Sequence, residues 1–380
     1  MSILDKQAMK QAVCQRVDEL QPVIYEIADY LHAHPELGTE ETLSAAFLRN
    51  LLQEQGCMVE DIVADVFPTA FHGLYGEGPF QMGFLAEYDA LPGIGHGCGH
   101  NIIAAMSVGA ALAFGRTVPD QATVHIYGCP AEETAGSKVY MTDAGVFDGL
   151  QATLIIHPSD ETAIGGTSYA THPLRFTFIG KEAHVADPVY HGINALDALV
   201  DFYGKLRALQ RTFTKPYILG LMIAEGGTAP NIIPGKAVLR ATIRALDADY
   251  LSEVMLPQIK QLARETAQQW GAEVEMVHYE AFCKNMVNDV RMDDYFAENF
   301  TALGEKFIRK PDDYASGSTD VGNVSQAIRT SQPEICIGTG IAAHTPDFAA
   351  AAGSEFARQQ ALVGAKAMAM TAVDVLWENK

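Results

Sequence analysis

Three side chains that bind transition metals lie within five residues of one another in a glycine-rich run. His96, Cys98 and His100 alternate with glycines in residues 93–101. Thiolate and imidazole are ligands of zinc and neighbouring metals, and the glycines allow the backbone to turn tightly enough for close side chains to reach one ion. A turn whose histidines only make local hydrogen bonds is the simpler alternative, but the density of ligands favours a metal site.

Three further loops carry ligand-type residues at or after the ends of predicted buried strands. Glu132 and Glu133 follow the first of these strands, His157 ends the second, and His344 follows the third. Ligands of open α/β sheets bind outside the carboxyl edge of the strands, so we expect these loops to converge there. A single histidine beside a proline is usually structural. Together with Cys98, however, these residues predict a metal centre.

The adjacent carboxylates Glu132 and Glu133 allow a division of labour. Neighbouring side chains on an extended loop point in different directions, so one can bind metal while the other faces a substrate. A divalent ion acidifies the water that it binds, and a base must still carry the proton to the leaving group. Two alternatives stay open at this point. The pair can be a solvated acidic surface, or Cys98 can be a nucleophile with His100 as its base.

The elements that must position these residues belong to an α/β fold. Strands and helices alternate up to about residue 170, which indicates a sheet covered on both faces. Residues 171–281 follow the order β-α-β-β-α-β, the ferredoxin-like split unit, and the α/β pattern returns from residue 282. We therefore predict a discontinuous catalytic domain (residues 1–170 and 282–380) with a central, mainly parallel sheet flanked by helices. The inserted α+β domain is residues 171–281.

Composition limits the class of protein and the kinds of partner that we expect. The 380 residues suggest about two domains, and 48% hydrophobic with 19% charged residues is typical of a soluble globular protein. The formal charge of −21 argues against nucleic acid and anionic membranes as partners. The amino terminus has no signal-peptide pattern, there is no apolar run of membrane-spanning length, and the six cysteines have no framework of spacings. We expect a cytoplasmic protein.

Ordered sequence blocks along nearly the whole chain resemble those of one known family, the M20 metallopeptidases. The similarity is greatest to its amidohydrolase branch, with aminobenzoyl-glutamate hydrolases and dipeptidase-like proteins. The blocks are residues 34–37, 87–101, 130–133, 180–184, 231–234, 318–322 and 344–346.

The resemblance implies a centre of two divalent metal ions (manganese, zinc or cobalt) and Glu132 as general base. Zinc members of the wider family have His-x-Asp where this chain has Glu-Tyr-Asp, at residues 87–89. That histidine ligand is missing, so Cys98 is the candidate bridging ligand, and Asp89 would orient a ligand. His96 would be structural. The implied metal ligands are Cys98, His100, Glu133, His157 and His344.

In the resembling family the inserted domain is a lid and a dimerisation domain. The resemblance implies that His184 stabilises an oxyanion, often in the partner's active site. It also implies that Asn231 contacts the substrate and that Arg244 binds a substrate carboxylate. The expected activity is hydrolysis of an amide next to a free carboxylate, in a dipeptide, an N-acyl amino acid or aminobenzoyl-glutamate, by a homodimer. A non-catalytic binding descendant of the fold is the alternative.

Overall fold

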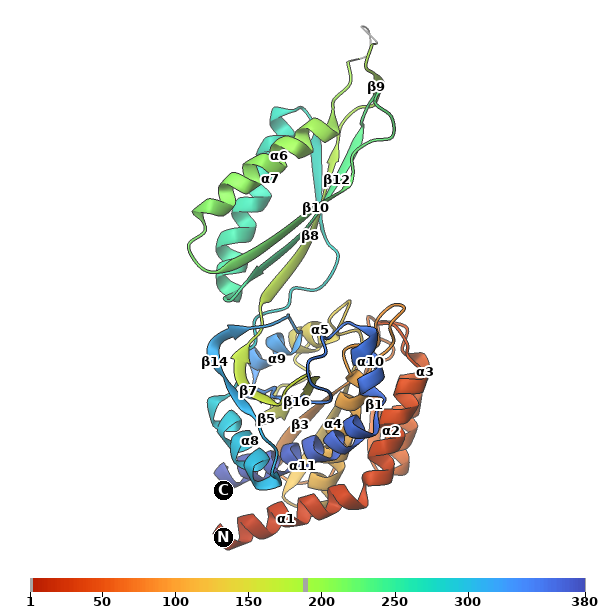
Figure 1. Cartoon of the computed structure of the whole chain (residues 1–380), viewed down its shortest axis with the longest axis vertical. Helices are drawn as coiled ribbons and strands as arrows, with labels where there is room; N and C mark the ends of the chain where they lie inside the picture. The colour runs from red at the N-terminus through yellow and green to blue at the C-terminus, as the bar shows by residue number, and fades with distance from the viewer. Residues whose placement is uncertain (1–2, 187–190, 380) are drawn as a thin grey trace. The chain divides into compact units, whose positions relative to one another are not determined.

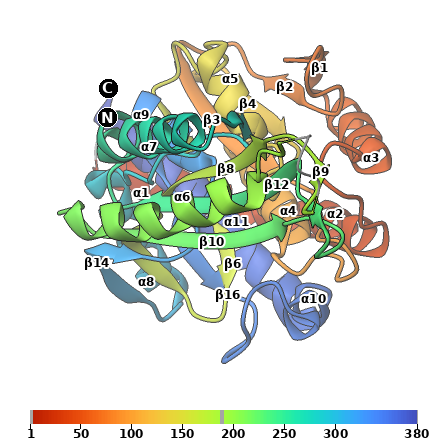
Figure 2. The same ribbon diagram turned by 90° about the horizontal axis from the view of Figure 1, so that it is seen from above.

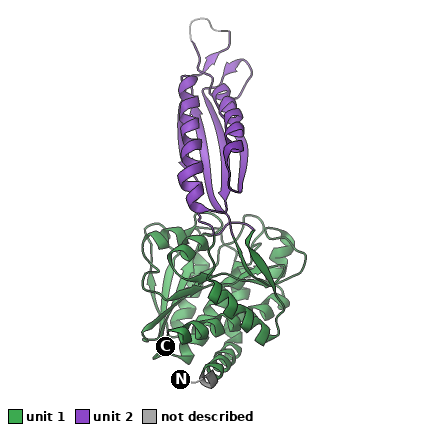
Figure 3. Cartoon of the chain, turned by 90° about the vertical axis from the view of Figure 1, so that its left-hand side faces the viewer, with its two compact units in different colours: residues 1–167, 286–314, 320–380 green, residues 168–285, 315–319 purple. Residues whose placement is uncertain are grey.

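The computed structural model describes residues 3–186 and 191–379. The chain forms two compact units, and each is discontinuous in sequence (Figure 3). Unit 1 consists of Met1–Thr167, Met286–Tyr314 and Asp320–Lys380. Unit 2 consists of Ser168–Asn285 and Ala315–Thr319.

A six-stranded mixed sheet forms the centre of unit 1 (Figure 1). The last four strands in its order pair in parallel, while the first two are antiparallel and close one edge. The strand order is β1 (Met58–Asp61), β2 (Phe71–Tyr75), β4 (Ala122–Cys129), β3 (Phe80–Glu87), β5 (Ala152–Leu154) and β15 (Thr330–Ser331).

Helices cover both faces of this sheet because its strands are apolar on both faces. In β3, Met82 and Phe84 face the larger core cluster, while Leu85 faces a second one. The helix α4 (His100–Thr117) is buried almost all round, which fits its unbroken run of small and apolar residues. Its layer also holds α1 (Ile3–Glu19), α2 (Gln21–Ala33) and α11 (Glu355–Glu378), and the opposite face holds α5 (Ser137–Asp143) and α9 (Val321–Ala327).

Unit 1 also contains a second sheet and three further helices. A four-stranded sheet has the order β14 (Ile308–Ala315), β7 (Ala163–Thr167), β16 (Glu334–Cys336) and β6 (His157–Ser159). Three further helices are α3 (Thr42–Glu54), α8 (Val290–Leu303) and α10 (Pro346–Ala352). Helix α1 ends at Glu19 and α2 begins at Gln21, with Pro22 in its first turn, where the missing N–H of proline is tolerated.

Unit 2 is built on an antiparallel sheet in the order β10 (Tyr217–Glu225), β12 (Lys236–Ala245), β8 (Ala170–Ile179) and β13 (Glu273–His278). Two helices run side by side over one face of the sheet (Figures 1 and 2). They are α6 (Ala195–Leu209), which the short η1 (Gln210–Thr212) follows, and α7 (Leu256–Gln269), which the π-helical η2 (Tyr250–Met255) precedes. The strands β9 (Ala183–His184) and β11 (Ile232–Ile233) form a separate ribbon.

The predicted fold class is confirmed. The α/β unit has its sheet between helices, and the inserted unit has the ferredoxin-like order. One local prediction is wrong: His157 does not end the strand that begins at Ala152, because β5 stops at Leu154 and His157 opens β6 of the other sheet. None of the described helices is both long and apolar enough to cross a membrane.

Candidate metal centre

Two loops with left-handed residues bring the first ligands together in unit 1. Gly99 has φ +77° and ends the glycine-rich run, so that His100 is the first residue of α4. His344 has φ +64°, a conformation that is strained for a residue with a Cβ. Its backbone N–H donates to the Gly97 carbonyl over 2.9 Å. This bond fixes the His344 loop against the glycine-rich run.

All five predicted ligands lie in one cluster. Their donor atoms form overlapping groups, and within each group the atoms lie within 4.8 Å of one another. The Cys98 Sγ is 3.5 Å from His157 Nε2, and His344 Nε2 is 3.2 Å from Glu133 Oε1. Cys98 belongs to two of these groups, one with His100 and His157 and one with Glu133 and His344, and a third group joins His100 and Glu133 to Glu132.

His100 is oriented as a ligand would be. Its Nδ1 donates to Asp89 Oδ1 over 2.8 Å, which leaves Nε2 as the ring atom that a metal ion would bind. That Nε2 is buried and has no hydrogen-bond partner among the described residues. It lies 3.9 Å from Glu133 Oε1 and 4.0 Å from Glu132 Oε2. A buried imidazole nitrogen without a hydrogen-bond partner, among thiol, imidazole and carboxylate groups, fits a divalent metal ion.

The two glutamates are positioned by a turn that is itself anchored. Ala131 has φ +58°, and its N–H donates to the buried Glu41 Oε1 over 2.7 Å. The Glu133 N–H donates to Asp89 Oδ2 over 3.0 Å. Asp89 therefore holds both His100 and Glu133 in place.

The same two glutamates differ in their electrostatics. Burial, followed by the negative charges of Glu87 and Glu133, raises the pKa of Glu132 well above its ordinary value. Burial also acts on Glu133, but the imidazoles of His344 and His100 outweigh it and lower its pKa to about 2. One carboxylate is thus suited to hold a proton and the other to stay charged.

The surroundings of Cys98 do not favour a thiol nucleophile. The side chain is almost fully buried, and burial raises the pKa of its thiol. Reactive cysteines are instead accessible and have lowered pKa values. His96 has a structural position: its Nε2 contacts the Leu31 carbonyl at 3.0 Å, and burial lowers its pKa to about 3.

A buried ionic network beside the candidate metal centre was not predicted from the sequence. Lys138 Nζ lies 2.8 Å from Glu87 Oε1 and 2.7 Å from Asp320 Oδ1, and all three side chains are buried. Glu87 Oε2 in turn lies 3.5 Å from His100 Nε2. The one available signal was a lysine five residues after the acidic pair.

The other three predicted residues lie in unit 2. His184 and Asn231 are neighbours on the exposed ribbon, where His184 pairs with Ile232 and the Val185 N–H donates to the Asn231 carbonyl. Arg244 is partly exposed on β12, opposite Thr171 on β8. The structure brings His184 and Asn231 together but does not bring Arg244 to them.

Comparisons with known proteins agree with this architecture. Residues 173–270 match the peptidase dimerisation domain. The chain is 32% identical to the Xaa-Arg dipeptidase of Mus musculus over 99% of this chain and 91% of the relative. It is also 32% identical to one of the p-aminobenzoyl-glutamate hydrolase subunits of Escherichia coli (strain K12), over 58% of this chain and 50% of that protein. A crystal structure from Bacillus subtilis, described as a dinuclear metal binding peptidase from the M20 family, has the same fold with a TM-score of 0.70. That match has 19% identity and covers 95% of this chain and 99% of the other.

Proposed function

Because the chain belongs to the M20 family of peptidases and amidohydrolases, we propose that it cleaves an amide bond next to a free carboxylate with the help of two divalent metal ions. The substrate class is a dipeptide, an N-acyl amino acid or an aminobenzoyl-glutamate type of molecule. The names of the two curated relatives, a dipeptidase and an aminobenzoyl-glutamate hydrolase, support this class.

One observation carries the proposal: thiol, imidazole and carboxylate groups that could hold metal ions lie around a buried imidazole nitrogen, His100 Nε2, that has no hydrogen-bond partner among the described residues. A descendant that had lost the chemistry would be expected to lack ligands or the base, yet Glu132 and all five ligand positions are filled. The fit of the residues favours two ions that share Cys98. His100 and His157 would hold one ion, and Glu133 and His344 would hold the other.

Each side chain has a distinct task in the reaction. When bound, the ions would polarise the scissile carbonyl and acidify the attacking water. Glu132 accepts a proton from the water while the water oxygen bonds to the carbonyl carbon. Glu132 then delivers this proton to the amine nitrogen as the C–N bond breaks. Asp89 keeps the His100 imidazole in the tautomer that presents Nε2. His184 stabilises the negative oxygen of the tetrahedral intermediate by a hydrogen bond.

The substrate contacts would come from two copies of the chain. Arg244 is eight residues beyond Lys236 along β12, which at about 3.4 Å per residue is roughly 27 Å from the end that leads to the ribbon. His184 and Asn231 on the ribbon therefore cannot share a small substrate with Arg244 of the same copy. We propose that Arg244 binds the substrate carboxylate in one protomer, while the ribbon of its partner contacts the reacting amide.

The edge strand β10 of the unit 2 sheet supports a dimer formed through unit 2. The strand β10 lies at the edge of the antiparallel sheet, so one row of its backbone groups is unpaired within the sheet. Its side chains Ile218 and Met222 are 46% and 54% exposed. An apolar exposed edge strand favours pairing with a second copy, and the match to a peptidase dimerisation domain supports this arrangement.

The test is a hydrolysis panel on the full chain loaded with manganese or zinc. It would include dipeptides that end in arginine, other dipeptides, acyl amino acids and aminobenzoyl-glutamate. We expect turnover of at least one class, complete loss in a chelator and recovery on adding metal. Glu132→Gln should lower kcat by about 10²–10⁴-fold with unchanged metal content, whereas Glu54→Gln, an exposed change of the same kind, should have no effect.

Two outcomes would contradict the proposal in different ways. A metal-loaded protein that binds these molecules but turns over none of them would indicate a binding descendant of the fold. Activity that survives the chelator and disappears in Cys98→Ser would indicate a thiol nucleophile instead.

A further inference from the structure

The helix-covered face of the unit 2 sheet ends in two histidines. On β8, Leu174 and Phe176 belong to the core beneath α6 and α7, and His172 continues this row. On β13, Met276 packs on the same core, and His278 continues that row. Both positions face the helices and would be apolar in a sheet built only for packing. Imidazoles at both places therefore need another explanation.

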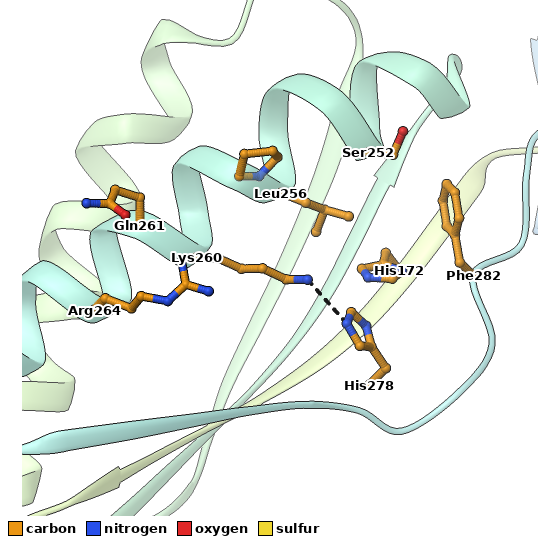
Figure 4. A pocket seen from close by; sticks show the side chains of 9 residues that line it. His172, Ser252, Leu256, Lys260, Gln261, Arg264, His278 and Phe282 are labelled. Carbon is orange, nitrogen blue, oxygen red and sulfur yellow. Dashed lines mark hydrogen bonds between the residues drawn. The ribbon is translucent and has the colours of Figure 1, made fainter.

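A hollow of about 700 Å³ lies above these two histidines. One face of the η2–α7 segment forms its other wall, and Lys260 and Arg264 follow one another there at helical spacing. Phe282, beyond β13, contributes an aromatic ring. Figure 4 shows Lys260 extending from the helix toward His278, with His172 beside it. All residues that line the hollow belong to unit 2, and none of them is a candidate ligand of the metal centre.

The helix carries a local irregularity at this wall. The π-helical η2 ends at Met255, and Pro257 lies in the first turn of α7. Proline cannot donate to the residue four positions earlier, and a π-turn is a way to accommodate the missing bond. Such single π-turns are frequent at functional sites. Here the turn also presents Ser252 to the hollow.

The two cationic side chains of the hollow, Lys260 and Arg264, have no carboxylate partner among the described residues. No carboxylate within residues 3–186 or 191–379 forms an ion pair with Lys260 or Arg264, although the chain has a net charge of −21. The Lys260 ammonium donates to His278 Nε2 over 3.2 Å, and the two histidine rings lie 4.0 Å apart. Burial and then the neighbouring His278 and Lys260 lower the pKa of His172 to about 3. Burial and then Arg264 also lower the pKa of Lys260.

The most buried polar atom of the hollow has no partner. The His172 side chain is 8% exposed, and its Nδ1 has no hydrogen-bond partner among the described residues. An unpaired buried polar atom destabilises the fold, and a ligand that binds to it removes this penalty. A divalent metal is a poor candidate, because the nearest groups are two imidazoles and two cations, one of which already occupies His278 Nε2.

We propose that this cationic pocket binds a small, multiply charged oxyanion, either inorganic phosphate or the phosphate group of an ester. Lys260 and Arg264 neutralise the charge, and the guanidinium offers the paired donors that phosphate oxygens accept. A proton on His172 Nδ1 supplies a further donor from below. Phe282 and Leu256 form an apolar side that suits the carbon skeleton of an ester. The site lies outside the hydrolytic centre and needs no metal.

Calorimetry on the full, zinc-loaded chain tests the proposal with inorganic phosphate and with phenyl phosphate. Phosphate can also bind at the metal centre, so the decisive quantity is the difference between wild type and Lys260→Gln/Arg264→Gln. We expect this double variant to lose one binding site, or to bind there at least tenfold more weakly, with unchanged metal content. The matched control is Arg211→Gln/Lys236→Gln, which removes the same charge elsewhere in unit 2 and should bind as wild type does.

Histidine NMR provides a second readout. Phosphate should shift the ring signals of His172 and His278 in wild type but not in the double variant, and His172→Gln assigns the signals. Tighter binding of phenyl phosphate than of phosphate would identify an ester as the ligand, and equal binding would identify free phosphate. Identical isotherms for wild type and the double variant, with unmoved histidine signals, would overturn the proposal. Neither result depends on hydrolytic activity, so the failure of this site and the failure of the proposed function are distinguishable.

Discussion

Lys138 and Glu87 form an ion pair of 2.8 Å in which both side chains are almost completely buried. Asp320 completes the arrangement at 2.7 Å from the same ammonium. Glu87 begins the Glu-Tyr-Asp segment, at the position where zinc members of the wider family carry a histidine ligand. In this chain the Lys138 ammonium neutralises the Glu87 carboxylate at that position, and Glu87 Oε2 lies 3.5 Å from His100 Nε2.

Replacement of Lys138 by methionine should strongly destabilise the protein. The change leaves two carboxylates buried without their cation, and breaking a buried ion pair from one side costs about 3–5 kcal/mol. Urea unfolding of the metal-free protein measures this loss. The triple variant Lys138→Met/Glu87→Gln/Asp320→Asn removes the charges together and should recover most of it. A single variant as stable as wild type would show that the network does not stabilise the fold.

Cys98 should be needed for both ions, whereas the outer ligands should each be needed for one. This follows from its membership in two ligand groups, one with His157 and one with His344. We expect two ions per chain in wild type, close to one in His157→Gln and in His344→Gln, and fewer than one in Cys98→Ser. Metal analysis after dialysis against a weak chelator measures this. If Cys98→Ser retains one ion as firmly as wild type does, Cys98 is not shared.

The sequence was sufficient to predict the fold class and the cluster of ligands because both depend on local patterns. Strand and helix periodicities fix the alternation of elements, and each candidate ligand lies in a short, recognisable sequence block. The carboxyl edge of a parallel sheet is then the place where such loops can meet. Cys98 and Glu133 follow this rule, since they come after β3 and β4, whereas His157 reaches the same cluster from the start of β6 in the other sheet.

The buried partners of the ligands could not be predicted in the same way. Lys138 is 51 residues from Glu87 and 182 residues from Asp320, and a single charged side chain in a helix is usually solvated. Only the tertiary structure places it between two carboxylates. The role of Glu41 could not be predicted for the same reason, since the hydrogen bond that it accepts from the Ala131 N–H joins residues 90 positions apart. The pocket in unit 2 also depends on residues that are distant in sequence.

Charges on the edge strand of unit 2 should separate the dimer. Ile218 and Met222 lie opposite Arg244 and Arg240 of β12, on the sheet face away from α6 and α7, so Ile218→Lys/Met222→Lys leaves the core intact. We expect a weakening of association by about 2–3 kcal/mol or more, at least thirtyfold in Kd. Sedimentation measures it. The control is Val290→Lys, an exposed apolar position of unit 1, and a wild type that is already monomeric would exclude the interface.

Glu41 should make the stability of the fold decrease as the pH rises. Burial raises the pKa of this carboxyl from 4.5 to about 7, against the opposing effect of its backbone hydrogen bonds. The folded state therefore binds a proton more tightly than the unfolded state, so the contribution is complete below pH 4.5 and is lost as the pH rises through about 7. A shift of this size corresponds to a loss on the order of 3 kcal/mol.

Glu41→Gln should remove this dependence because the amide resembles the protonated acid. Its oxygen can accept from the Ala131 N–H as Glu41 Oε1 does, and its nitrogen can donate to the Thr69 hydroxyl, which now lies 3.2 Å from Glu41 Oε2. Urea unfolding of metal-free protein at pH 5 and at pH 8 tests this. The variant should match wild type at pH 5 and exceed it at pH 8. Equal stabilities at both values would mean that Glu41 is ionised in the folded protein at no cost.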